Sequence, residues 1–224
     1  MRLILAHRHD VAALDLAGRW GDAALLLTPA DLHLERLLLT VDARGDARAA
    51  LPSRPQVTSV LNRLAGVGRG DLDHIDGRDL DYAAAELDAF LRALLAAWQG
   101  PVVNAPSTTC LNGPGWRPEQ WMLAAAAAGL PVKPVRRRVP PTPDDDPLGA
   151  DGDLTGASVV GDRWFGPVPD AVGRRLCGLA RSAGCALMQA TLDADGTVVH
   201  LSAWPDVSAP EVAAALAAIL DGAS

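Results

Sequence analysis

The sequence predicts an α/β protein, with an N-terminal open, mostly parallel sheet domain followed by a small α+β domain with antiparallel hairpins. In the first half, short apolar runs alternate with segments of helical periodicity, which is typical of an open sheet covered by helices. In the last third, short extended runs are joined by Gly-containing turns, which indicates hairpins. A stretch rich in Pro and Asp lies between these parts. We therefore expect domains at residues 1–134 and 158–224, joined by a linker at 135–157.

The composition excludes several classes of protein. The chain has 224 residues, of which 49% are hydrophobic, so it can bury a substantial core. Its net charge of −7 gives no basic field of the kind that nucleic-acid binding requires. No apolar run approaches the ~20 residues that span a bilayer, and the N-terminal apolar stretch is too short for a signal peptide. We expect a soluble, cytoplasmic protein whose three cysteines are reduced, mostly buried thiols.

The first half contains several predicted strands and one short helix. Asp10 is a candidate cap for a helix whose apolar positions Ala13, Leu14, Ala17 and Trp20 have helical spacing. The turn sequence at residues 42–46 predicts a hairpin on the edge of the sheet. The predicted strands are Arg2–Ala6, Ala23–Leu27, Arg36–Val41 and Val57–Leu61.

The clearest helix runs from Asp81 to Trp98, where leucines and aromatic residues recur at spacings of three and four. Gly100 and Pro101 end it. Val102 and Val103 then form a short strand that we expect to be central in the sheet. This strand delivers Asn104 to its carboxyl end, where ligand crevices of open α/β sheets lie.

A candidate binding region follows this strand. The loop from Ser107 to Trp116 combines small hydroxyl and amide residues with glycines, and Pro118 and Gly129 suit the start and end of the next helix. The free N–H groups of that helix start favour an anion such as a peptide carboxylate. Two alternatives remain open, because Asn104 also suits a turn before Pro106 and tryptophans near a helix start often serve packing. The candidate ligand- or partner-binding residues are Asn104, Thr108, Asn112, Trp116, Arg117 and Trp121.

The last part reads as hairpins with a helix between them. Gly161-Asp162 turns the first hairpin, and a helix is expected from Ala171 to Ala183. The second hairpin pairs Cys185–Leu192 with Thr197–Ala203 around Asp195-Gly196. A capping box of Ser208 and Glu211 is expected to start a terminal helix that ends at Leu220. Before these elements, Arg136–Arg138 could contact a phosphate or an acidic partner, or simply lie on a solvated surface.

Established catalytic motifs are missing from the sequence. We find no phosphate-binding loop with Gly-Lys-Ser/Thr, no Gly-x-Ser-x-Gly elbow and no His-Glu-x-x-His helix. His7 and His9 could supply two metal ligands, but no third is identifiable, and both could be surface histidines. His200 and Ser202 share one face of a strand and could act as base and nucleophile, or form a polar face left by lost metal binding.

The second hairpin resembles the last hairpin of the ATP-grasp ligases. In that family an Asp on the first strand and a Leu-Glu-x-Asn-Pro sequence on the second hold the magnesium ions of ATP. Gln189, Ser202 and Trp204 stand in the three ligand places, within residues 188–205. Mg²⁺ prefers carboxylates, phosphate oxygens and water, and an indole offers it no lone pair.

The resemblance extends to other segments. Residues 101–132 are similar to the part of glutathione-synthetase-type and RimK-type proteins that leads into the nucleotide-binding region. Ser158–Phe165 is similar to the strand pair after the nucleotide lid, with Gly156 where the family has an Arg. Only residues 135–157 stand where the family places the lid subdomain and its lysines, and Lys133 is the single lysine of the chain. The resemblance thus implies a pre-ATP-grasp-like domain at 1–134 and a remnant of the C-terminal ATP-grasp subdomain at 158–224.

This resemblance implies a truncated, degenerate relative that is not itself a ligase. We expect a catalytically silent binding or accessory subunit with no catalytic residue, no cofactor and no metal. Its expected partner is a peptide or protein, such as an active full-length ATP-grasp ligase, in a dimer or heteromer; no membrane or nucleic acid is expected. Two alternatives stay open: an ATP-dependent carboxylate-amine ligase completed by another chain, and a small-molecule sensor or carrier with its pocket between the loop 104–121 and the C-terminal sheet.

Overall fold

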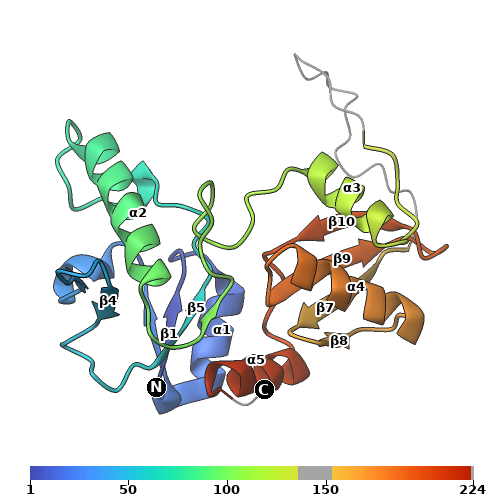
Figure 1. Cartoon of the computed structure of the whole chain (residues 1–224), viewed down its shortest axis with the longest axis horizontal. Helices are drawn as coiled ribbons and strands as arrows, with labels where there is room; N and C mark the ends of the chain where they lie inside the picture. The colour runs from blue at the N-terminus through green and yellow to red at the C-terminus, as the bar shows by residue number, and fades with distance from the viewer. Residues whose placement is uncertain (136–152, 223–224) are drawn as a thin grey trace. The chain divides into compact units, whose positions relative to one another are not determined.

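A computed structural model describes residues 1–135 and 153–222 (Figure 1). The chain folds as two compact units. The first unit comprises Met1–Gly115 together with Val207–Ser224, and the second comprises Trp116–Asp206. The predicted run Arg136–Arg138 lies outside the described residues.

The first unit is built on a parallel sheet whose strands occur in the order β2-β1-β5-β6. Adjacent strands are parallel at every pairing. All four residues of β5 are buried, as are Leu3, Ile4 and Leu5 of β1, which is the pattern of a sheet covered on both faces. The strands are β1 (Arg2–Leu5), β2 (Ala24–Leu27), β5 (Ser59–Asn62) and β6 (Val102–Val103).

Three α-helices belong to this unit among its described residues, with short 3-10 turns at Gly21–Ala23, Asp31–Leu34 and Arg69–Asp71. Helix α2 (Leu80–Ala96) packs leucines of its apolar stripe against the sheet, in one cluster with Leu3, Leu5 and Val60. Helix α1 (Val11–Trp20) contacts β2, and α5 (Pro210–Leu220) contacts β5 and β6. The Asp10 side chain accepts a hydrogen bond from the Ala13 N–H, which confirms the predicted cap of α1.

The hairpin of β3 (Leu38–Val41) and β4 (Ala47–Ala50) forms a separate two-stranded sheet. The prediction that it lies on the edge of the main sheet was therefore wrong. The turn itself was predicted correctly, because Asp42 accepts from the N–H groups of Arg44 and Asp46. Local turn chemistry specifies the hairpin, whereas its neighbours in space depend on distant packing.

The second unit has an antiparallel sheet with the strand order β10-β9-β7-β8. Both predicted hairpins and the predicted helix between them are confirmed. The strands are β7 (Thr155–Val160), β8 (Arg163–Phe165), β9 (Leu187–Leu192) and β10 (Val198–Ser202). The helices are α3 (Pro118–Ala127) and α4 (Asp170–Ser182).

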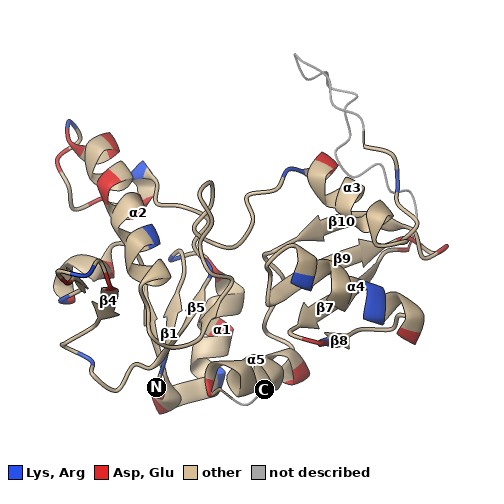
Figure 2. Ribbon diagram, viewed as in Figure 1, with Lys and Arg blue, Asp and Glu red and all other residues tan. Residues whose placement is uncertain are grey.

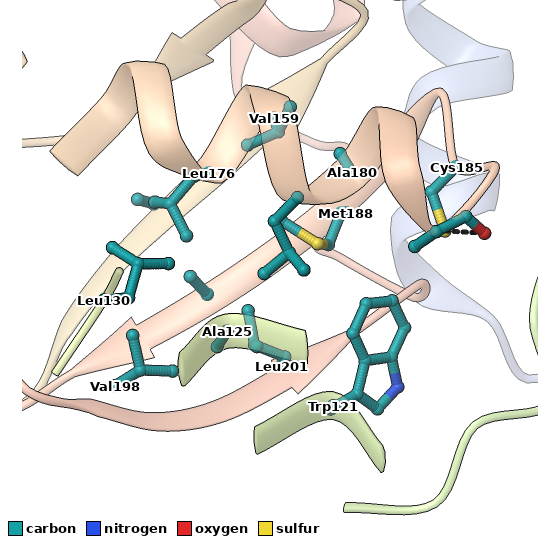
Figure 3. Close-up of a cluster of buried hydrophobic side chains, with 14 of the residues drawn as sticks. Trp121, Ala125, Leu130, Val159, Leu176, Ala180, Cys185, Met188, Val198 and Leu201 are labelled. Atoms are coloured by element: carbon teal, nitrogen blue, oxygen red, sulfur yellow. Dashed lines mark hydrogen bonds between the residues drawn. The ribbon is translucent and has the colours of Figure 1, made fainter. Parts of the chain in front are cut away.

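Both described helices of the second unit lie on the same face of its sheet (Figure 1). Figure 3 shows Trp121 and Ala125 of α3 beside Leu201, with Leu176 of α4 and Met188 in the same cluster. The Arg175 guanidinium also donates to the Gly129 carbonyl, so α4 holds the C-terminal end of α3. The core of this unit therefore lies between one sheet face and two helices.

Several sequence predictions need correction. Leu14 is 47% exposed and the buried residues of α1 are Ala13 and Leu16, so the apolar face is rotated from the one expected. Val102–Val103 is an edge strand rather than a central one. Helix α5 begins at Pro210 with Ala209 as its N-cap, one residue after the predicted cap Ser208.

The division into units also differs from the predicted domains. Helix α3 contacts β10, so the second unit begins before position 134. Helix α5 contacts β5 and β6, so the C-terminal helix belongs with the N-terminal sheet. Among the described residues, no helix is both long and apolar enough to cross a membrane.

Candidate functional site

The sheet of the second unit has two unlike faces. Met188, Ala190 and Leu192 of β9 point into the core between the sheet and its helices, whereas Gln189 and Thr191 alternate with them on the opposite face. On the opposite side, Leu187 and Val160 are buried, whereas the other residues are exposed or partly exposed. We call these other residues the open face: Gly156, Ser158, Gln189, Thr191, His200 and Ser202. Strands β7, β9 and β10 contain no Lys, Arg, Asp or Glu (Figure 2). Strand β8 adds Arg163 and Phe165 to the same side of the sheet, as cross-strand partners of Val160 and Ser158. The open face therefore offers neutral hydrogen-bonding groups beside one arginine.

The predicted ligand places of the family's metal hairpin lie together on this face. Gln189 of β9 is the direct cross-strand partner of Ser202 of β10, and Trp204 follows two residues later. The oxygens of both polar side chains already have local partners. Ser202 Oγ accepts from the Trp204 N–H at 3.0 Å, and Gln189 Oε1 accepts from the Asp206 N–H at 3.3 Å. These bonds fix the chain where it leaves β10.

This donor set does not fit the magnesium ions of an ATP-grasp ligase. A hard divalent cation needs anionic oxygens, and here a neutral amide and a hydroxyl face each other across the hairpin. The described residues also contain no group of three or more His, Cys, Asp or Glu side chains that could hold a metal ion. We therefore derive no chemical step through a metal or nucleotide at these strands.

Three of the six predicted binding residues lie in the first unit. Asn104 follows the end of β6 as expected, is 1% exposed and has a φ of 53°, so it adopts the left-handed conformation that suits a turn. Asn112 is also buried, whereas Thr108 is exposed. The loop folds back on the end of β5, because the Asn62 amide donates to the Leu111 carbonyl and the Leu111 N–H donates to the Ala65 carbonyl at 3.0 Å. The loop thus covers part of the carboxyl edge that was expected to hold a ligand.

The other three predicted residues lie in the second unit. Trp121 is 4% exposed in the core, and the rings of Trp116 and Trp121 meet edge to face at 4.9 Å. Arg117 is exposed and is the N-cap of α3. Its N–H donates to Gln120 Oε1 at 2.9 Å, so the helix start has a partner from its own first turn. The packing alternative therefore describes Trp121 well, and the binding role of these residues stays a prediction.

Sequence reasoning missed a buried ion pair at the carboxyl edge of the parallel sheet. Arg63, which follows β5, donates through Nε to Asp10 Oδ2 at 2.7 Å and through a terminal nitrogen to Oδ1 at 3.1 Å. Both side chains are less than 10% exposed. The signal was present, since Arg63 directly follows β5 and Asp10 ends the loop that leads from β1 into α1. This pair joins α1 to the end of β5.

The histidines are placed as follows. His7 Nδ1 lies 2.8 Å from Asp71 Oδ1, and His9 Nε2 accepts a hydrogen bond from the Arg8 guanidinium, so the two rings have different partners. His200 lies on the open face, and the Ser202 hydroxyl beside it is bonded to the backbone of Trp204. A shallow groove of about 810 Å³ lies in the first unit, between the end of β4 and the end of α5. None of the six predicted binding residues lines it.

The chain has an ATP-grasp-like fold, which is the class that the parallel sheet and the antiparallel hairpin sheet define. It is similar to the crystal structure of macrocyclase MdnC bound with precursor peptide MdnA from Microcystis aeruginosa MRC, with a TM-score of 0.68 and 11% identity over 99% of this chain and 100% of that one.

Two further solved structures share this fold. A RiPP-associated ATP-grasp ligase from Chryseobacterium gregarium, in complex with ADP and a leader and core peptide, has a TM-score of 0.67 and 10% identity over 100% of this chain and 97% of that one. The ATP-grasp ligase PsnB, complexed with minimal precursor, Mg and ADP, has a TM-score of 0.62 and 16% identity over 96% of each chain. Neither a protein-family model nor the sequence of a curated protein matches this chain. At these identities the likeness establishes the fold.

Proposed function

We propose that this chain is a catalytically silent ATP-grasp-like protein that binds a peptide, as an accessory subunit of a peptide-modifying system. The observation that carries the proposal is the hairpin of β9 and β10. Its facing residues Gln189 and Ser202 are neutral, and their oxygens accept hydrogen bonds from the chain's own N–H groups. An acyl-phosphate ligase needs magnesium and phosphate contacts that these side chains do not supply.

The small number of residues between Val132 and Thr155 supports the proposal that the chain is truncated. Val132 bridges Val198, Val198 pairs with Leu192, and Leu192 pairs with Thr155, so these residues form one row across the sheet. With strands about 4.8 Å apart, the row spans about 14 Å. The stretch from Lys133 to Leu154, which joins the two ends of that row, stands where the family inserts its lid subdomain. A stretch of this length has too few residues for a subdomain with its own core.

The open face supports the choice of a peptide as ligand. A peptide backbone presents neutral donors and acceptors, which match the hydroxyl, amide and imidazole groups of Ser158, Gln189, Thr191 and His200. MdnC, PsnB and the Chryseobacterium ligase were each crystallised with peptides. We propose that a peptide segment, free or carried by a partner ligase, lies across this face.

The proposal is tested with synthetic, fluorescently labelled peptides encoded by the genes that neighbour this one. Anisotropy should show saturable binding, which Thr191→Lys weakens by about tenfold or more because it places a charged side chain at the centre of the face. The matched control is Leu123→Lys, on the 73% exposed position of α3, which adds the same charge and should leave binding unchanged. Equal loss in both variants would contradict binding at the open face.

Catalytic silence is tested separately on the same peptides. Incubation with ATP and Mg²⁺, followed by mass spectrometry, should show no loss of water from the peptide and no ADP. ATP-dependent loss of water from the peptide would instead support the alternative of a ligase, and adding a purified full-length ligase from the same gene neighbourhood provides the positive control.

A further inference from the structure

The outer edge of strand β3 is an unpaired strand edge. Among the described residues β3 pairs only with β4, in the register Leu38↔Ala50, Leu39↔Ala49, Thr40↔Arg48 and Val41↔Ala47. In Figure 1 this hairpin lies at the periphery of the first unit, near α2. The strand contains no Pro, no charged residue and no bulge, which are the features that usually protect an edge from pairing with another chain.

The hydrogen-bond alternation of the hairpin shows which backbone groups point outward. The Asp42 N–H donates to the Asp46 carbonyl, so Thr40 and Leu38, at two-residue steps from Asp42, also bond toward β4. The Ala49 N–H of β4 points away from β3, because it donates to the Ala97 carbonyl at 3.1 Å. Both observations place the N–H and C=O groups of Leu39 and Val41 on the outer edge. Outside the β3–β4 ladder, no other described residue makes a backbone hydrogen bond to either residue.

The sequence around this edge is complementary to itself. In an antiparallel pairing of two copies centred on Leu39, the two Leu39 residues exchange hydrogen bonds, and the Val41 N–H of each copy meets the Leu37 carbonyl of the other. The same register places Leu38 opposite Thr40, and Arg36 of each copy opposite Asp42 of the other. Arg36 is exposed and has no ion pair within the described part of the chain. The Leu37 N–H keeps its bond to the Glu35 carbonyl at 3.2 Å. The register that pairs the outward groups of Leu39 and the Val41 N–H thus also pairs opposite charges.

We propose that β3 pairs with β3 of a second copy of this chain in that register, so that two hairpins join into one sheet across a two-fold axis. A two-fold interface requires a surface that is complementary to itself, and this edge meets that requirement in both hydrogen bonding and charge. The side chains of Leu38 and Val41, which are 46% and 62% exposed, gain Thr40 and Leu37 of the other copy as cross-strand neighbours in the paired sheet. This dimer does not depend on the open face or on catalytic silence.

Sedimentation velocity of the full chain over a wide range of concentrations tests the proposal. We expect a reversible monomer–dimer equilibrium that weakens as salt is added. Val41→Pro should make the chain monomeric at every concentration, because it removes an outward N–H while leaving the β3–β4 hydrogen bonds intact. Its melting temperature at low concentration should match that of the parent chain, which shows that the variant folds.

A charge variant tests the register. Arg36→Glu places like charges opposite each other twice in the dimer and should raise the dissociation constant about tenfold. Arg174→Glu, an equal charge change at an exposed helix position, should leave it unchanged. A chain that is monomeric at all concentrations, or a dimer that persists in Val41→Pro, overturns the proposal. A dimer that Arg36→Glu and Arg174→Glu weaken equally overturns the register.

Discussion

The two main sheets of this molecule are covered in different ways. In the parallel sheet of the first unit, helix α2 packs on one face, and every residue of β5 is buried. In the antiparallel sheet of the second unit, β9 alternates between buried and partly exposed residues, because α3 and α4 pack on the same face. The buried side chains of the first sheet stabilise the fold. The second sheet has one face whose side chains can change with little loss of stability. Gln189 and Ser202, which the resemblance places at metal-ligand positions, lie on that face.

The largest expected difference between the sheets is in the cost of truncating a side chain. Leu61 of β5 is 0% exposed, so Leu61→Ala should lower the free energy of unfolding by about 2–5 kcal/mol. Thr191→Ala on the open face should lower it by less than about 1 kcal/mol, because Thr191 fills no core space. Urea unfolding of both variants measures the difference, and similar losses would contradict the contrast between the two sheets.

A smaller effect tests the covered face of the second sheet. A Cβ on Gly173 of α4 would lie 2.3 Å from ring atoms of Trp164, so Gly173→Ala should destabilise the chain by about 1–3 kcal/mol. Gly178 lies on the same helix with nothing within 4 Å of its would-be Cβ. Gly178→Ala should therefore stabilise the chain by up to about 1 kcal/mol, through helix propensity. The melting temperatures of the two variants measure these effects. Changes of the same sign in Gly173→Ala and Gly178→Ala would contradict the prediction.

Carboxylates placed at positions 189 and 202 of the open face test whether the neutral side chains there are the reason that the hairpin does not fit Mg²⁺. In the double variant Gln189→Asp and Ser202→Glu, two like charges become direct cross-strand neighbours, which should cost up to about 1 kcal/mol. Mg²⁺ should raise the melting temperature of this variant, because it screens or bridges the two carboxylates, and should leave the parent chain unchanged. A parent chain that responds to Mg²⁺ as strongly as the variant would count against the lost-metal interpretation.

The smallest expected effect concerns acid stability in the first unit. The Thr28 hydroxyl and N–H donate to Asp31 Oδ2 at 2.7 and 2.9 Å, and they hold the pKa of Asp31 below its ordinary value of 3.8. A lowered folded-state pKa contributes stability that is complete above pH values near 3.8 and is lost as the pH falls through the lowered value.

Thr28→Ala should therefore lower the free energy of unfolding by less than about 1 kcal/mol near neutral pH. The loss should become smaller as the pH falls below about 3.8, because Asp31 becomes protonated. Urea unfolding at a series of pH values measures this difference. A difference in the free energy of unfolding between the parent chain and Thr28→Ala that grows as the pH falls would contradict this prediction.

Local chemistry made much of the fold predictable. The stripe of α2, the turn at Gly161-Asp162 and the hairpin around Asp195-Gly196 depend on nearby residues, and all three are confirmed. The sequence could not predict which elements meet in space. It placed the β3–β4 hairpin on the main sheet and assigned α5 to the C-terminal domain, because both placements depend on long-range packing.

The site was predictable only in part. Gln189 and Ser202 are brought together as cross-strand neighbours, as the resemblance implied. The hydrogen bonds that use their oxygens depend on how the chain leaves β10, and no local pattern encodes that path. The burial of Asn112 was missed for a similar reason, because amide groups are common both in cores and in binding loops, whereas the burial of Trp121 agrees with the packing alternative.

Isothermal titration of the full chain with ATP and Mg²⁺ tests the central claim most directly. We expect no saturable heat, because the facing side chains of β9 and β10 are neutral and their oxygens are bonded to the backbone of Trp204 and Asp206. Saturable heat with a one-to-one stoichiometry, lost when Gln189 is changed to Ala, would contradict the account.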